Sequence, residues 1–365
     1  SNRNAICNGA VGATFILLEE DPDRLARALA LALAGLEVYV QTAFEADGAS
    51  GEGVSYWHAG LINFVVFAEL LRLRTRGTID LLGTERMKAV AAFPPKVLLS
   101  PGRFFSYSDG DEVSTFNPGI IQRLAERTEV TELLTVLAAP ESLRPDLPYF
   151  HRLWRALLWW DGDQPDDVPI GDALLPDSQI ARVTAATPSG TPVVLAAKAQ
   201  HNGVNHNHND VGGFVLHVDG ETFLCDPERG VYDQYKIHGR YNVPFAGSYG
   251  HSVPRIDGAE QSAGRAFEGE ILLFDVSRDT KRVEMRIERA YDVPGLASAH
   301  RSLTVTPDGV CVLEDAFGFD ADARPVEEAF VTWRRTLVSG GTALFIGRRH
   351  VLELTIEEPA DAAFA

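Results

Sequence analysis

The stretch GGFVLHVDGETFLCD, residues 212–226, decides the fold class of the second half of the chain. Two segments rich in apolar residues, Phe214–Val218 and Glu221–Cys225, flank the dipeptide Asp219-Gly220. Asp-Gly between two such segments is a strong signal for a two-residue hairpin turn, because both central positions of that turn require a positive φ. The sequence therefore predicts an antiparallel β-hairpin at this point.

An apolar pattern with a period of two extends this prediction toward the end of the chain. From Ile180 onward it recurs in short segments, among them PVVLAAKA, EILLFDV, RVEMRIERA, RSLTVT and GVCVLEDAF. Turn residues separate these segments at short intervals, which is typical of a large antiparallel sandwich. We expect an antiparallel β-sandwich domain over residues 180–365.

The first 160 residues have a helical period instead. Asp21-Pro22 is a good helix start, with Asp as the N-cap and Pro in the first turn. The apolar residues that follow at steps of four and seven share one helix face: Leu25, Leu29, Leu36, Val40 and Phe44. A second helix is predicted from Tyr56 or Trp57 to Arg74. We expect it to bury Leu61, Phe64, Phe67, Ala68 and Leu71.

Three more helices and two irregular segments complete this part of the chain. The helices are predicted near residues 77–92, 118–137 and 148–159, and the long loop 94–119 runs between them; long loops in compact domains are often functional. The Asp- and Pro-rich segment 161–179 indicates a linker. The predicted organisation is a helical domain over 1–160, a linker over 161–179 and a β-domain over 180–365. Three tryptophans are expected in the core at the domain junction: Trp154, Trp159 and Trp160.

Composition excludes several classes of protein. The 365 residues are 45% hydrophobic and 23% charged, as in globular proteins. With 33 basic and 51 acidic side chains the net charge is −18, so non-specific binding of nucleic acid is not expected. The apolar run Leu25–Val40 contains Arg27 and Glu37, so we expect no membrane span. Three scattered cysteines are too few for a disulfide framework.

The beginning of the chain, SNRNAICNGA, has no basic region followed by an apolar run, so no signal peptide is predicted. The chain also begins inside what reads as a helical segment. We therefore expect that an N-terminal portion of the helical domain is missing.

The densest polar cluster is QHNGVNHNHND, residues 200–210. In an extended loop His206 and His208 can approach a common centre, or one can bind metal while the other faces a substrate. The predicted hairpin returns Asp226 toward this loop, and His251 follows 25 residues later. Two imidazoles and a carboxylate suit Zn²⁺. The alternative is a hydrogen-bonded turn without metal, since Asn and His tolerate unusual backbone angles.

Four blocks of sequence resemble one family. NHNHNDVGGFVLHVDGETFLCDPERGVY (205–232) and GSYGHSVPRIDGAEQ (247–261) resemble the β-domain signature of heparinase II/III-like polysaccharide lyases, which include relatives of alginate lyases. SNRNAICNGA (1–10) and GEGVSYWHAG (51–60) resemble two motifs of the family's helical domain. The resemblance implies an (α/α) toroid, here incomplete at its N-terminus, followed by an antiparallel β-sandwich.

The resemblance also implies roles for individual residues. His208, Asp226 and His251 match the ligands of a zinc ion that is usually regarded as structural. His206 matches a catalytic histidine and Tyr56 the catalytic tyrosine. Four residues between the zinc ligands are implied to bind sugar: Arg229, Tyr235, Arg240 and Tyr241.

The asparagines of the first helix are assigned less sharply. Asn2 best matches the polar residue that neutralises the substrate carboxylate, but Asn4 and Asn8 compete with it, and Asn4 is counted among the substrate-binding residues. Helix capping is the alternative role for Asn2 and Asn4. Arg3 stands where some relatives have histidine or an aromatic residue, which leaves the substrate preference open.

The implied reaction is β-elimination at a 4-linked uronic acid, in the cleft between the two domains. It requires removal of the C5 proton, stabilisation of the enolate-like carboxylate and protonation of the leaving O4. An Asn amide can stabilise the carboxylate, while Tyr and His can serve as base and acid. Which of Tyr56 and His206 is the base stays open. For Tyr56 the alternative is an ordinary aromatic residue packed at a helix start.

The implied partner is an anionic polysaccharide or oligosaccharide, with no nucleic acid and no membrane. The net charge favours a carboxylate-only or lightly sulfated glycan over highly sulfated heparin. The resemblance favours a periplasmic or secreted location, and the oligomeric state is left open, a homodimer included. Two other functions compete with the lyase: a zinc-dependent hydrolase and a non-catalytic glycan-binding protein.

Overall fold

The computed structural model describes residues 2–143 and 150–365, and the chain divides into two compact units. The first unit comprises residues 1–180 together with 203–207, and the second comprises 181–202 with 208–365. His206 therefore belongs to the mainly helical unit and His208 to the other.

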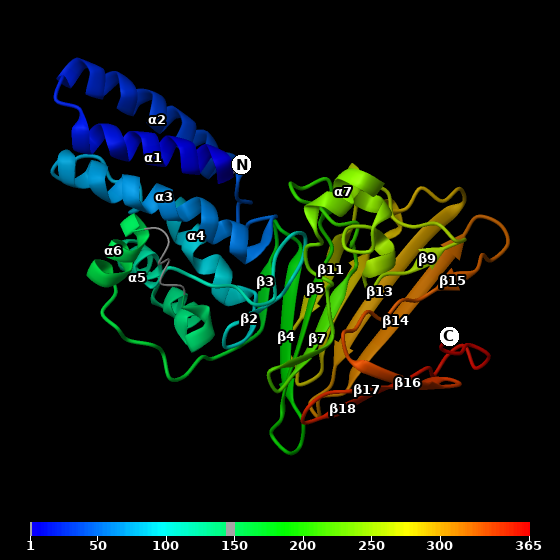
Figure 1. The fold of residues 1–365 in the computed structure, drawn as a ribbon. Helices are drawn as coiled ribbons and strands as arrows, with labels where there is room; N and C mark the ends of the chain where they lie inside the picture. The colour runs from blue at the N-terminus through cyan, green and yellow to red at the C-terminus, as the bar shows by residue number, and fades with distance from the viewer. Residues whose placement is uncertain (1, 144–149) are drawn as a thin grey trace. The chain divides into compact units, whose positions relative to one another are not determined.

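The first unit is built mainly from helices (Figure 1). Its elements are α1 (Asn2–Leu18), α2 (Pro22–Thr42), α3 (Gly53–Arg74), α4 (Glu85–Lys96), β1 (Leu98–Ser100), β2 (Arg103–Phe104), α5 (Pro118–Thr128), the 3-10 helices η1 (Thr131–Leu137) and η2 (Pro140–Ser142), α6 (Phe150–Trp159) and the short strand β3 (Ala173–Leu175). Helix α1 packs against both α2 and α3, and the three lie side by side.

Helix α2 begins where the sequence predicts. The Asp21 side chain accepts hydrogen bonds from the backbone N–H groups of Asp23 and Arg24, and Pro22 lies in the first turn. The buried face differs in part from the predicted one. Its members within the helix are Leu25, Ala32, Leu36 and Tyr39, whereas Leu29 and Val40 are only half-buried.

Helix α3 is the core helix of this unit. All five of the side chains predicted to be buried are buried: Leu61, Phe64, Phe67, Ala68 and Leu71. The helix begins at Gly53, three residues before the predicted start, so Tyr56 lies within the first turns and does not open the helix.

Two of the remaining helices differ from the prediction. The helix predicted near 77–92 begins only at Glu85, because the Thr84 side chain caps it by accepting from the backbone N–H of Met87. The helix predicted over 118–137 is divided at Glu129, which adopts a left-handed conformation with φ +61° between α5 and η1. The core position expected for Trp154 is wrong, since this side chain is 43% exposed.

Two helices, α2 and α3, are long and apolar enough to cross a membrane by length and composition alone. In α3 the most apolar window is 72% buried within the protein, as expected of a core helix, and in α2 it is 22% buried. From the sequence, Arg27 and Glu37 were expected to exclude a membrane span. By composition alone they do not exclude one, because α2 contains both residues and is still long and apolar enough.

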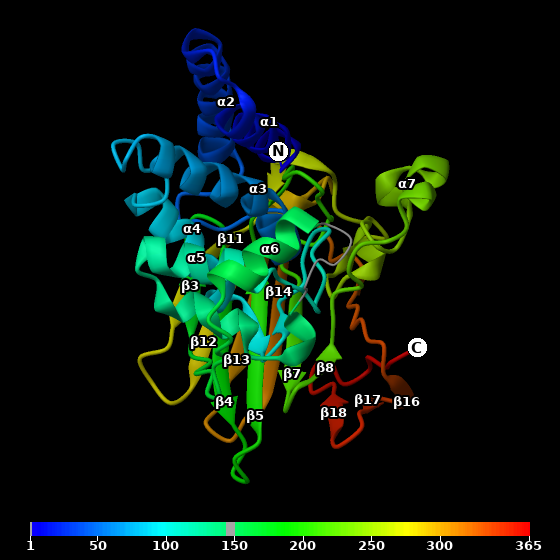
Figure 2. The ribbon, with the colours of Figure 1, turned by 60° about the vertical axis from the view of Figure 1, so that its left-hand side comes forward.

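The second unit consists mainly of antiparallel strands (Figure 2). Its elements are β4 (Ile180–Ala186), β5 (Pro192–Lys198), β6 (His201–Asn202), β7 (Phe214–Val218), β8 (Glu221–Leu224), α7 (Tyr232–His238), η3 (Arg240–Asn242), η4 (Ser248–Gly250), β9 (Arg255–Ile256), β10 (Gly264–Glu268), β11 (Glu270–Asp275), β12 (Lys281–Arg286), η5 (Glu288–Ala290), β13 (Leu296–Val305), β14 (Cys311–Phe319), β15 (Val326–Glu327), β16 (Arg335–Ser339), β17 (Thr342–Ile346) and β18 (Val351–Thr355).

These strands form several sheets. β4, β5, β7 and β8 are neighbours in that order, and β11 to β14 form a second sheet in sequence order. β16, β17 and β18 make a third, and two strand pairs, β6 with β10 and β9 with β15, complete the set. The architecture is thus helical first and antiparallel β second, as predicted.

The predicted hairpin is confirmed. Val218 pairs with Glu221 across the turn, and the two turn residues Asp219 and Gly220 have φ values of +50° and +79°. Strands β7 and β8 carry the chain from the polar segment 200–210 back toward Asp226.

Candidate active site and metal centre

The candidate active site of the helical unit is built on two tight turns. Gly53 starts α3 with φ +82°, and a side-chain carbon added to it would lie 2.9 Å from the Cα of Gly110. The hydroxyl of Tyr107 donates to the backbone oxygen of Ser50 at 2.8 Å, and the hydroxyl of Ser106 donates to the backbone oxygen of Gly110 at 2.8 Å. These contacts hold the turn before α3 against residues 106–110 of the long loop.

Tyr56 and His206 lie next to each other in this unit. Their ring centroids are 4.6 Å apart and the ring planes are inclined by 38°. Tyr56 is held by α3, whereas His206 is in the segment 203–207 and has a φ of +58°. A positive φ is uncommon for a residue other than glycine and is found at functional sites more often than elsewhere. Two residues 150 positions apart are thus brought into ring contact.

Asp109 is a member of this site that the sequence did not reveal. Its carboxylate oxygen Oδ2 lies 2.6 Å from Nδ1 of His206, and its side chain is fully buried. The only sequence signal was the length of the loop 94–119, which did not single out any one residue of the loop.

Asn2 and Glu52 form a second pair in the same unit. The Asn2 side-chain amide donates from Nδ2 to Oε2 of Glu52 at 3.1 Å. Burial raises the pKa of Glu52 above its usual value, and the negative charge of Asp109 acts in the same direction against the opposing effect of His206.

The other two asparagines of α1 have structural contacts. Asn4 donates from Nδ2 to the backbone oxygen of Gly35 in α2 at 2.7 Å, and Asn8 donates to the backbone oxygen of Asn4 at 3.1 Å. Of the three candidates for carboxylate neutralisation, Asn2 is the one whose side chain bonds to a residue of the GEGVSYWHAG motif. His58 of that motif has a structural contact, since its Nε2 accepts from the backbone N–H of Asn117.

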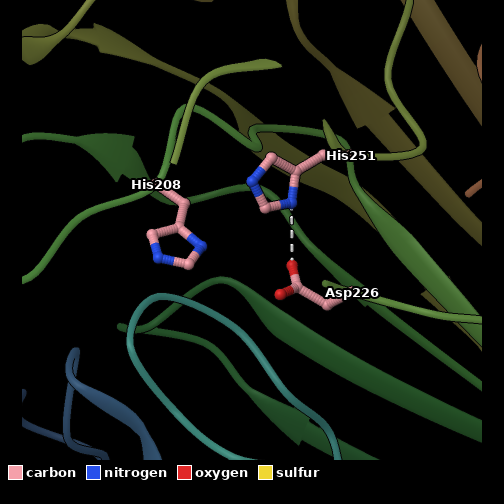
Figure 3. Close-up of side chains that lie close together, drawn as sticks. All are labelled: His208, Asp226 and His251. Carbon is pink, nitrogen blue, oxygen red and sulfur yellow. Dashed lines mark hydrogen bonds and ion pairs between the residues drawn. The ribbon is translucent and has the colours of Figure 1, made fainter. Parts of the chain in front are cut away.

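The second unit contains a candidate metal centre, shown in Figure 3. One ligand atom from each of His208, Asp226 and His251 lies within 4.8 Å of the other two. Nδ1 of His251 lies 2.8 Å from Oδ2 of Asp226, and the rings of the two histidines have centroids 5.2 Å apart.

The chemistry of this cluster fits a metal ion. His208 and His251 are almost completely buried, and Nε2 of His251 is buried without a hydrogen-bond partner in the described part of the protein. A buried nitrogen without a partner is costly, and a metal ion would satisfy it. Nitrogen and oxygen donors of this kind suit Zn²⁺.

A buried ion pair accompanies the cluster. Nζ of Lys198 lies 2.5 Å from Oδ1 of Asp210, and both side chains are buried. Although burial opposes ionisation, the positive charge of Lys198 lowers the pKa of Asp210. The Asp226 carboxylate likewise outweighs the effect of burial on His251 and raises the pKa of that ring.

The four residues implied to bind sugar lie in and around α7. Tyr235 is 8% exposed and packs with Val243 and Ala246, and Tyr241 packs against this small cluster. The Arg240 guanidinium lies over the Tyr235 ring, 4.7 Å from its centroid, and the Tyr235 hydroxyl accepts from the backbone N–H of Gly230. Tyr235 therefore supports the segment that carries Arg229 and Arg240.

Comparison with known proteins gives a structural likeness without a sequence match. No family model matches the chain, and no curated protein matches it. Among solved structures, heparinase III has a TM-score of 0.69 and 16% identity over 95% of this chain and 52% of its own. The heparan sulfate lyase HepC from Pedobacter heparinus has a TM-score of 0.61 and 14% identity over 93% of this chain and 50% of its own.

A further heparinase III structure agrees, with a TM-score of 0.62 and 14% identity over 93% of this chain and 49% of its own. The chain spans about half the length of the solved structures that it matches. At these identities the likeness concerns the fold alone. Over most of its length the chain has a heparinase III-like lyase fold.

Proposed function

We propose that the protein is a polysaccharide lyase that cleaves a uronic-acid-containing glycan by β-elimination. The observation that carries this proposal is the ring contact between Tyr56 and His206. Their ring centroids lie 4.6 Å apart, in a chain with a heparinase III-like fold. In this proposal the helices correspond to part of an (α/α) toroid and the sheets to its β-sandwich.

Three residues of the helical unit fit the proton transfers and the carboxylate stabilisation that the reaction requires. Tyr56 and His206 supply the base that removes the C5 proton and the acid that protonates the leaving O4. A neighbouring imidazole that accepts the proton of a phenol makes the phenol a better base. An amide has two N–H donors, of which Asn2 gives one to Glu52. The other is available for the substrate carboxylate, whose charge grows as the proton leaves.

We assign the metal centre a structural role. His208, Asp226 and His251 would hold Zn²⁺, and the bound ion would supply fixed positive charge and cross-link three chain segments. The proton transfers are assigned to the side chains of Tyr56 and His206.

The proposed substrate is a carboxylate-only or lightly sulfated glycan. The net charge of −18 disfavours a densely sulfated chain, which calls for clustered Lys and Arg. Arg229, Arg240 and Tyr241 are proposed to contact it around α7. Heparan sulfate of low sulfation and alginate are therefore the first substrates to compare with heparin.

The test is the appearance of an unsaturated uronyl product, measured by its ultraviolet absorbance, on alginate, heparan sulfate, heparin and hyaluronan. Water labelled with oxygen-18 distinguishes elimination from hydrolysis, because hydrolysis adds the oxygen atom of water at the cleaved bond and elimination does not. Tyr56→Phe and His206→Ala are each expected to lower kcat by about 10²-fold or more. Tyr249→Phe removes the hydroxyl of a tyrosine that is 64% exposed and serves as the matched control.

Three results would contradict this assignment. No product from the folded wild type on the whole panel argues against a lyase. Incorporation of labelled water indicates a hydrolase. Glycan affinity without turnover, unchanged in Tyr56→Phe and His206→Ala, indicates a binding protein.

A further inference from the structure

We propose that Asp109 is a positioning residue for His206: its carboxylate holds a proton on Nδ1 of the ring and thereby directs Nε2 to the reaction. This inference rests on the proposed function, because it assigns the support of the histidine that the function uses. The carboxylate oxygen Oδ2 lies 2.6 Å from Nδ1, which is a short distance for a hydrogen bond between a ring nitrogen and a carboxylate.

The Asp109 carboxylate can accept a hydrogen bond from Nδ1 of His206, and its burial limits competition from solvent for that bond. Asp109 has a fully buried side chain, whereas the side chain of His206 is 32% exposed. The pair is therefore buried on the carboxylate side and open on the imidazole side. A buried carboxylate needs a donor, and a ring N–H supplies one.

The backbone around Asp109 is fixed by contacts that do not involve His206. Ser108 adopts a φ of +53°, and the Ser106 hydroxyl bonds to the backbone of Gly110. Residues 106–110 in turn pack against the start of α3 through Tyr107 and Gly110. Since α3 also carries Tyr56, the same rigid contact sets the positions of Asp109 and of the tyrosine.

The chemical consequence follows from the two forms of neutral imidazole. When Nδ1 carries the proton, Nε2 has a lone pair and can accept a proton from another group. Without the carboxylate, this interaction no longer favours a proton on Nδ1 over one on Nε2. In this proposal the helical unit contains an Asp109–His206 pair next to Tyr56. Asp109 acts on the reaction only through the histidine.

The first test reads the ring directly and does not depend on turnover. The full chain is labelled with nitrogen-15 in its histidine rings, and His206→Gln assigns the His206 signals. We expect a proton on Nδ1 in the wild type. In Asp109→Asn we expect this preference to weaken, because a carboxamide can either accept or donate. A wild-type ring with no proton on Nδ1 overturns the proposal, whatever the enzyme does to glycans.

The second test is kinetic. Asp109→Asn is expected to lower kcat by about 10-fold to 100-fold with KM changed by less than about 3-fold, since orientation of the histidine affects the transition state more than substrate binding. Glu112→Gln is the control: it removes an ion pair with Arg103 at 2.8 Å on the same loop and should leave kcat near wild type. Equal kcat in Asp109→Asn and wild type overturns the proposal.

The two tests separate this inference from the proposed function. If the wild type forms no unsaturated product, the lyase assignment fails while the nitrogen-15 spectra still decide whether Asp109 fixes the ring. Asp109→Asn keeps the shape of the buried side chain, so one variant supplies both measurements.

Discussion

Asn2 donates its side-chain amide to Glu52 at 3.1 Å, and this bond links the first turn of α1 to the residue that precedes α3. Glu52 is half-buried and lies in the electrostatic field of both His206 and Asp109. The carboxyl group that accepts from the Asn2 amide thus lies where burial makes its negative charge unfavourable.

This placement predicts how stability depends on pH. Burial raises the pKa of Glu52, so the folded state holds the proton more tightly than the unfolded state does. The resulting stabilisation is complete below the unfolded pKa of about 4.3 and is lost as the pH rises through the raised value. Glu52→Gln has no proton to lose. Its free energy of unfolding should therefore increase relative to wild type as the pH rises through this window.

Denaturant unfolding of wild type and Glu52→Gln at a series of pH values measures the difference. Glu357→Gln, which changes an exposed glutamate, is the control and should show no such trend. A difference between Glu52→Gln and wild type that stays constant or shrinks with rising pH contradicts the raised pKa.

A second prediction concerns the close contact between Gly53 and Gly110. Gly77 has the same backbone conformation as Gly53, with φ +83° against +82°, but no atom within 4 Å of an added side-chain carbon. Gly77→Ala should cost about 1–2 kcal/mol from the backbone alone. Gly53→Ala should cost about 1–3 kcal/mol more, because the turn must also move away from Gly110.

Thermal and denaturant unfolding of the two variants test this comparison. Product formation by Gly53→Ala should fall as well, whereas Gly77→Ala should keep it, because only Gly53 packs against the loop that carries Asp109. Equal losses of stability in the two variants would show that the contact between the turns contributes little.

How much the sequence revealed depends on how local the signal is. The hairpin at Asp219-Gly220 was predictable, because the turn residues and the apolar segments adjoin along the chain. The candidate pairing of Tyr56 with His206 came from the family resemblance, since periodicity carries no information on residues 150 positions apart. The roles of all these site residues remain predictions.

Asp109 and Glu52 show why the rest could not be predicted. The Asp109–His206 pair spans 97 positions, and the segment 94–119 has no periodic pattern that fixes its path. Acidic residues also occur at positions 111 and 112 of the same loop, so composition could not select Asp109. Similarly, a helix start at Gly53 instead of Tyr56 depends on the contact with Gly110, which is tertiary.

A third prediction concerns a buried charge cluster in the second unit. Arg301 in β13 is fully buried and bonds to Asp315 at 2.6 Å and to Glu328 at 2.7 Å. It also donates to the backbone oxygens of Gly212 and Ser252. The two carboxylates outweigh burial and raise the pKa of Arg301 above its usual value.

Arg301→Met should therefore destabilise the protein by about 3–5 kcal/mol, because the buried Asp315 carboxylate is left without its partner. Arg282→Met removes a more exposed arginine from the neighbouring strand, where it pairs with Glu284 at 2.9 Å. Its cost should be below about 1 kcal/mol. Similar denaturation midpoints for the two variants would contradict the dominance of the buried cluster.

The last prediction concerns metal content. Purified protein should contain about one Zn²⁺ per chain, because one donor atom from each of three residues, of the types that zinc prefers, lies within 4.8 Å of the other two. Removal by a chelator should lower Tm, since an ion at a hundredfold excess over its Kd stabilises the folded state by about 2.7 kcal/mol. His251→Ala and Asp226→Asn should each lose the metal and the response to chelator.

His238→Ala is the matched control, because His238 is an exposed histidine of α7 in the same unit and should keep the full metal content and the full shift in Tm. Elemental analysis and differential scanning calorimetry, each with and without chelator, provide the two measurements. If His251→Ala binds as much zinc as His238→Ala, the ion is held elsewhere and the cluster of His208, Asp226 and His251 is not the metal centre. If neither wild type nor control contains metal and added Zn²⁺ leaves Tm unchanged, the buried Nε2 of His251 must be satisfied in another way, and the structural role assigned to zinc is wrong.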